Sequence, residues 1–109
     1  MGGSTSRTVL IRLIGPGLSA VGLSSGTMPD PQLTLFNSSQ ATIAANNDWG
    51  GDQQITNTGG RVGAFAVGNP LSKDAMLLVT LAPGLYTAQA NPVSGTPGGT
   101  AIVEVYEVP

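Results

Sequence analysis

The chain has 109 residues, enough for one domain, and 40 % of them are hydrophobic, so a core can form. Four basic residues and a net charge of −2 argue against nucleic-acid binding, which needs a row of phosphate contacts. The absence of Cys and His excludes disulfides and catalysis by either residue type, and no apolar run approaches the roughly 20 residues of a membrane-spanning helix.

Residues 1–6 are expected to be a flexible leader, since they have neither the basic start nor the apolar centre of a signal peptide. Residues 7–14 form a β-branched run of strand length, which ends at the Gly-Pro-Gly of 15–17. A loop rich in glycine and proline follows. Strands are then expected at 32–37 and 41–46, joined by a connection of hairpin length.

The middle of the chain, 47–60, is its least regular part and is expected to be a loop. A short strand is predicted at 61–67. Residues 74–81 are expected to form a central strand, because apolar side chains on both faces indicate burial on both sides or contact with a neighbouring subunit. Alternating patterns predict the last two strands at 85–91 and 100–108.

About seven to eight short strands, with at most one helical turn at 19–23, predict an all-β fold: an antiparallel, jelly-roll-like β-sandwich. Residues 7–109 are expected to form this single domain. Arg12 and Glu104 each lie in the middle of a predicted strand. We expect them to lie opposite each other, with the first and last strands paired and both termini at one edge. The alternative is two independent surface charges.

The loop after residue 46 is the best place for a metal site. Asn46, Asp48 and Asp52 carry the hard oxygen ligands that calcium takes, and the glycines between them allow carbonyl groups to turn inward. The spacing is not that of an EF-hand, and two carboxylates are few for calcium. The alternative is a loop in which these side chains accept hydrogen bonds from nearby backbone amides. Calcium is the only cofactor that the sequence suggests.

Trp49, the single tryptophan, lies in the same loop. An aromatic face on a β-sandwich can stack on a sugar ring, so Trp49 is a candidate ligand contact. The alternative is that its ring folds back and caps the core.

Catalytic residues are scarce. The six acidic residues show no pairing of the kind that a glycosidase needs. A catalytic Ser–Lys dyad would have to use Lys73 and the adjacent Ser72, but the side chains of neighbouring residues on a strand point in opposite directions. The sequence therefore predicts a protein that is not an enzyme.

Several segments taken together resemble the bacterial pre-peptidase C-terminal (PPC) domain and related β-sandwich modules. This resemblance implies an accessory or structural role beside larger exported enzymes or adhesins. The segments are Arg-Thr-Val-Leu-Ile-Arg at 7–12, Gly-Pro at 15–16, Asp-Pro-Gln-Leu-Thr-Leu-Phe at 30–36, Asn-Asn-Asp-Trp at 46–49, Gly-Leu-Tyr-Thr-Ala at 84–88 and Val-Glu-Val-Tyr-Glu at 103–107.

We therefore expect a non-catalytic, extracellular or cell-surface module that mediates attachment or self-assembly, as an oligomer or filament. Only 9 % of its residues are charged, so little like charge keeps copies apart. Its partner would be a second copy, a polysaccharide or a domain of a parent protein. The alternative function is a carbohydrate-binding module that uses Trp49 and the adjacent polar loop.

Overall fold

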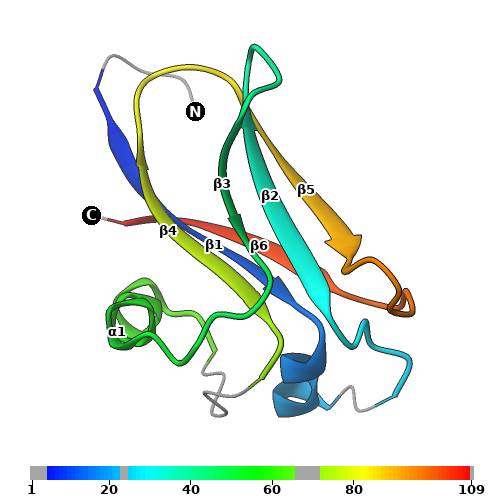
Figure 1. Cartoon of the computed structure of the whole chain (residues 1–109). Coiled ribbons are helices and arrows are strands. Elements are labelled where there is room, and N and C mark those ends of the chain that lie inside the picture. Colours follow the sequence, from blue (N-terminus) through cyan, green and yellow to red (C-terminus); the bar gives the residue numbers. More distant parts are fainter. Residues whose placement is uncertain (1–4, 23–24, 66–71, 109) are drawn as a thin grey trace.

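Two antiparallel sheets of three strands, one 3-10 helix and one α-helix make up the described part of the chain (Figure 1). The structure is a computed structural model and describes residues 5–22, 25–65 and 72–108. In chain order the elements are β1 (Arg7–Ile14), η1 (Pro16–Val21), β2 (Pro31–Asn37), β3 (Thr42–Asn46), α1 (Gln53–Val62), β4 (Ala75–Leu81), β5 (Tyr86–Pro92) and β6 (Ile102–Val108).

The strand order is β4–β1–β6 in one sheet and β3–β2–β5 in the other, and every pair is antiparallel. The prediction of a β-rich, sandwich-like fold is confirmed. The predicted pairing of the first and last strands is also confirmed, because β1 pairs with β6. The placement of both termini at one edge is wrong, since β1 is the central strand of its sheet.

The described residues form six strands, not seven to eight. In place of the strand predicted at 61–67, Arg61 and Val62 are the last residues of α1, and residues 66–67 lie outside the described residues. The stretch 47–60, expected to be a loop, contains most of this helix. Gly63 ends the helix in the left-handed conformation, with φ 79°, which glycine adopts without steric penalty.

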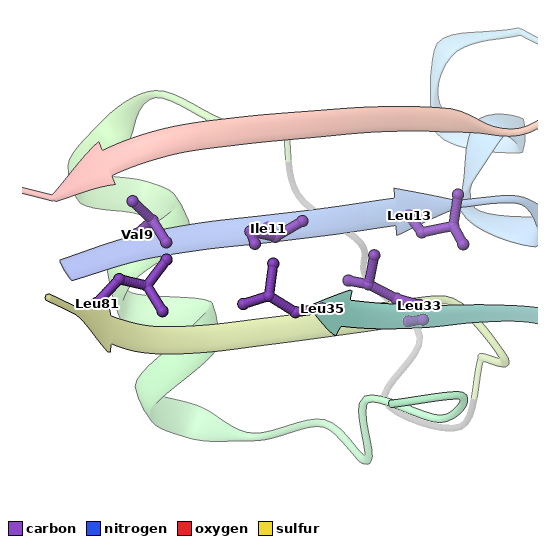
Figure 2. Packing of buried hydrophobic residues seen from close by; sticks show 7 residues of the cluster. Val9, Ile11, Leu13, Leu33, Leu35 and Leu81 are labelled. Carbon is purple, nitrogen blue, oxygen red and sulfur yellow. The ribbon is translucent and has the colours of Figure 1, made fainter. Parts of the chain in front are cut away.

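The main core lies between the two sheets. Because side chains alternate along a strand, Val9, Ile11 and Leu13 of β1 face one way, toward Leu33 and Leu35 of β2 (Figure 2). All five are at most 3 % exposed. Burial of such side chains contributes about 1.5 to 3 kcal/mol each to folding, so this layer is the principal source of stability.

A second, smaller core covers the other face of the β4–β1–β6 sheet. Buried Ile14, Leu18, Trp49 and Met76 form this cluster, and Ile55 of α1 packs against it. The protein therefore has three layers, with two sheets face to face and α1 on the outer face of one of them (Figure 1).

The strand predicted to be central at 74–81 is β4, which lies at an edge of its sheet. Its two apolar faces have different covers: Ala75 and Leu81 are buried in the core between the sheets, and Met76 in the cluster under α1. Burial on both faces therefore does not require a neighbouring strand on both sides.

Asp74, just before β4, is fully buried and forms hydrogen bonds with the backbone between β1 and η1, which is distant in sequence. Its Oδ1 accepts hydrogen bonds from the backbone amides of Gly15 (2.8 Å) and Gly17 (3.0 Å), and its Oδ2 accepts one from the Ser72 hydroxyl (2.8 Å). A Cβ at Gly17 would lie 2.6 Å from Asp74 Oδ2. Glycine is thus needed at Gly17 because the carboxylate approaches the backbone so closely.

No helix in the described ranges is long and apolar enough to cross a membrane.

Candidate functional site

The three residues proposed as calcium ligands precede α1 in the chain, and the side chains of two of them form hydrogen bonds with backbone groups. Asp52 is the N-cap of α1, and its Oδ1 accepts from the amides of Gln54 (2.8 Å) and Ile55 (3.3 Å). Asn46 accepts from the Met76 amide through Oδ1 and donates to the Asp48 carbonyl through Nδ2, both at 3.0 Å. These hydrogen bonds are of the kind expected under the alternative hypothesis, in which the side chains of the loop bond to nearby backbone groups and not to a metal ion.

Within residues 5–22, 25–65 and 72–108 no group of three or more acidic side chains gathers to hold a metal ion. A calcium site at Asn46, Asp48 and Asp52 stays a prediction that titration calorimetry can test.

Trp49 lies in the core beneath α1. Its side chain packs with Ile14, Leu18 and Met76, its indole Nε1 donates to the Ser72 hydroxyl at 3.0 Å, and the residue is 7 % exposed. A ring buried to this degree presents no open face on which a sugar could stack. Its position thus lends no support to a role as a carbohydrate platform.

The side chains of Ser72 and Lys73 interact with different residues. The Ser72 hydroxyl bonds Asp74 and Trp49, whereas Lys73 Nζ lies 3.8 Å from Asp30 Oδ2 and is exposed. The structure does not bring these two side chains together as a pair.

Arg12 and Glu104 lie opposite each other in the β1–β6 register, as predicted, with Arg12 Nε 3.2 Å from Glu104 Oε1. The Arg12 side chain is 4 % exposed and that of Glu104 19 %. Burial raises the pKa of the Tyr106 hydroxyl, and the carboxylate of Glu104 beside it raises that pKa further. Arg12 and Glu104 thus form a largely buried ion pair on the outer face of the sheet.

Phe65 also contacts the Arg12 guanidinium, through both its backbone carbonyl and its ring. Its carbonyl accepts from Arg12 Nη1 at 2.9 Å, and the guanidinium carbon lies 4.6 Å from the centre of its ring, within the range of a cation–π contact. The segment of Phe65 was expected to be a strand, so its contact with Arg12 could not be anticipated.

A cavity of about 130 Å³ lies between α1 and the sheet, with Arg12 in its wall. The rest of its lining is mainly apolar. It includes Leu10, Trp49, Ile55, Ala64, Phe65 and Met76.

The side of the sandwich between β5 and β6 is open. Val103 and Val105 of β6 are register partners of the buried Leu13 and Ile11, so they lie on the inner sheet face, yet they are 46 % and 62 % exposed. We call this region, formed by β6 and the facing inner residues of β5, the open side.

The cause of the opening is the way the sheets overlap. The more extensive contacts between the sheets are those of β2 and β3 with β1 and β4, whereas β5 and β6 run in clearly different directions (Figure 1). Ala88 and Ala90 of β5, which share the inner face of Leu35 and Leu33, are also exposed. Within the described residues the open side therefore exposes Val103 and Val105 of β6 and Ala88 and Ala90 of β5, with the charged Glu107 on the same face of β6.

Neither family models, curated proteins nor solved structures provide a match to this chain. The resemblance to the pre-peptidase C-terminal domain thus rests on the quoted segments alone, and the function is argued from the geometry.

Proposed function

We propose that this chain is a non-catalytic structural module that pairs with a second copy of itself through its open side. The observation that carries the proposal is Val105, which is 62 % exposed on a sheet face where its register partner Ile11 is 3 % exposed. Single exposed apolar residues are ordinary, but here Val103 shares its face of β6 with Val105, and Ala88 and Ala90 are exposed on the inner face of the other sheet.

The backbone of β6 supports pairing at its outer edge. The Met76 amide donates to Asn46 instead of to β1, so Met76 and its register partner Arg12 do not bond each other. Because bonding direction alternates along an antiparallel strand, Arg12 bonds toward Glu104, and the amides of Val103 and Val105 point to the free edge. A free edge with unpaired amides is a template for another strand.

The sequence of β6 is complementary to itself in the antiparallel direction. If Val105 lies opposite Val105 of the second copy, then Glu104 lies opposite Tyr106 and Val103 opposite Glu107. No glutamate faces another glutamate in this register, so like charges do not oppose the pairing. The same surface is used on both copies, which gives a closed two-fold dimer in preference to a filament.

Charge also favours a second copy as the partner. Both glutamates of β6 have arginine partners within the chain, Arg12 with Glu104 and Arg7 with Glu107, the latter at 3.4 Å. The edge is therefore locally close to neutral, and two such edges approach without strong repulsion.

We extend the proposal to an extracellular or cell-surface location and to kinship with pre-peptidase C-terminal modules of jelly-roll type. Its support is the order of the resembling segments and the pairing of antiparallel sheets. In this reading the dimer would supply the neighbour strand that β6 lacks.

The test is the molar mass in solution, measured by light scattering or sedimentation over a range of concentrations. We expect the unaltered chain to have twice the monomer mass. Val105→Lys is expected to weaken the dimer about tenfold, because the two lysines would lie directly opposite each other with like charges and the valine pair would be lost.

Val21→Lys is the matched control, since Val21 is 52 % exposed but lies on η1. It should leave the dimer intact. A monomer at every concentration, or equal loss in both variants, would contradict the proposal.

A further inference from the structure

A groove of about 440 Å³ follows β4, which is the edge strand at the opposite end of its sheet from β6. The groove is lined by five consecutive residues of β4, 76–80, and by Thr8, Asp52, Gln54 and Ile55. Because side chains alternate between the two faces of a strand, a hollow that touches consecutive residues runs along the edge of the sheet. The groove is therefore separate from the β6 edge that forms the proposed dimer.

The backbone of β4 presents unpaired hydrogen-bonding groups at this edge. The Met76 amide donates to Asn46 Oδ1 and so points away from β1. Alternate residues of an antiparallel strand bond in the same direction, so Leu78 and Thr80 also direct their amides and carbonyls away from β1. The 2.8 Å hydrogen bond between the hydroxyls of Thr8 and Thr80 agrees with this direction, since side chains approach more closely in pairs without backbone bonds.

An extended peptide is the ligand that matches these groups. Leu78 and Thr80 each offer one donor and one acceptor, two residues apart, which is the spacing at which an added strand bonds. Among the described residues no strand lies beside this edge. Addition of a peptide strand to a free sheet edge is a general mode of recognition, in which the backbone bonds provide affinity.

The charge of the peptide follows from Asp52. Of the described residues that line the groove, only Asp52 is charged, and it is exposed. The strand Ala75–Leu81 itself has no charged residue. A groove with one carboxylate and no basic residue in its lining favours a peptide with a basic side chain over one with an acidic side chain.

We propose that the free edge of β4 and the start of α1 bind an extended peptide segment that carries a basic side chain. The peptide adds a fourth strand to the sheet through the backbone of Leu78 and Thr80. Since β6 is the other edge of the same sheet, a module paired with a second copy can still bind such a segment of another protein.

The probes are two blocked peptides, acetyl-Thr-Val-Lys-Val-Thr-amide and the same peptide with glutamate in place of lysine. Binding to the full chain is followed by NMR through the backbone amide signals of Leu78 and Thr80. We expect the lysine peptide to shift both signals. At low salt it should bind about threefold or more tightly than the glutamate peptide.

Leu78→Pro removes an amide that points into the groove but no bond to β1, so the sheet should stay folded. Binding of the lysine peptide should fall about tenfold, because a backbone bond is lost and the proline ring blocks the added strand. The shift is then read at Thr80, and Thr80→Pro, read at Leu78, repeats the test at the second amide.

Val105→Pro is the matched control, because it makes the same change at the free edge of β6 and should leave peptide binding unchanged. Asp52→Asn keeps an oxygen that can cap α1 but removes the charge. It should bring the affinities for the two peptides to within about twofold of each other.

Three results with the peptides would overturn the proposal. They are no shift of either amide signal with the lysine peptide, unchanged binding in both proline variants of β4, and equal affinity of the unaltered chain for the two peptides. Shifts of the Leu78 and Thr80 signals with protein concentration alone would assign this edge to a second copy and would also overturn it.

Discussion

The two sides of this sandwich differ in how well they are covered. On the closed side, β1 and β4 are covered by β2 and β3 on one face and by α1 and Trp49 on the other. On the open side, the valines of β6 have the same alternation as β1 but remain exposed.

This difference shows that alternation decides which way a side chain faces, whereas coverage depends on where the second sheet lies. Substitutions on the closed side should therefore cost stability, and those on the open side should alter association. The predictions below test this division, from the largest expected effect to the smallest.

Asp74→Ala should produce the largest loss of stability. It removes the acceptor of the Gly15 and Gly17 amides and of Ser72 in a fully buried place, and we expect the free energy of unfolding to fall by about 3 to 5 kcal/mol. Urea denaturation measures it. Asp48→Ala, at an exposed carboxylate, should change stability by less than about 0.5 kcal/mol. A similar loss of unfolding free energy in the two variants would contradict the structural role given to Asp74.

Arg12→Met should cost about 3 kcal/mol, because Glu104 is left without its partner in a largely buried position. The double variant Arg12→Met with Glu104→Gln removes both charges. It should be more stable than the single variant by at least about 1 kcal/mol. Additive effects in denaturant unfolding would show that the two groups are not coupled.

Asp52→Ala should cost about 1 kcal/mol, since it removes the N-cap of α1. Asp52→Asn keeps a capping oxygen and should lose only a few tenths of this. If thermal unfolding shows equal losses for both, the role of Asp52 lies elsewhere than in capping the helix.

The pairing of the first and last strands could be predicted from the sequence, but the strand order of their sheet could not. Strong β-branched runs defined β1 and β6, and the mid-strand charges of Arg12 and Glu104 identified their pairing. The helix α1 was missed because Thr56, Gly59 and Gly60 have poor helix propensity. Its ends do carry a signal, an aspartate before its first turn and a glycine after its last.

The candidate sites could be predicted only in part. The loop of Asn46 and Asp52 was recognisable, but whether oxygen atoms bind backbone amides or a metal depends on the local geometry. The exposure of Val103 and Val105 could not be predicted, since the pattern of β6 matches that of a covered strand. The cavity beside Arg12 could not be predicted either, because its walls include residues of α1 and Phe65, where the sequence predicted a loop and a strand.

The most direct test of the proposed dimer is amide hydrogen exchange along β6 at several protein concentrations. The amides of Val103, Val105 and Glu107 should exchange slowly when the protein is concentrated and quickly when it is dilute, because only the second copy protects them. The amides of Glu104 and Tyr106, which bond β1, should be protected at both concentrations. Fast exchange of the Val105 amide at every concentration would contradict pairing through the open side.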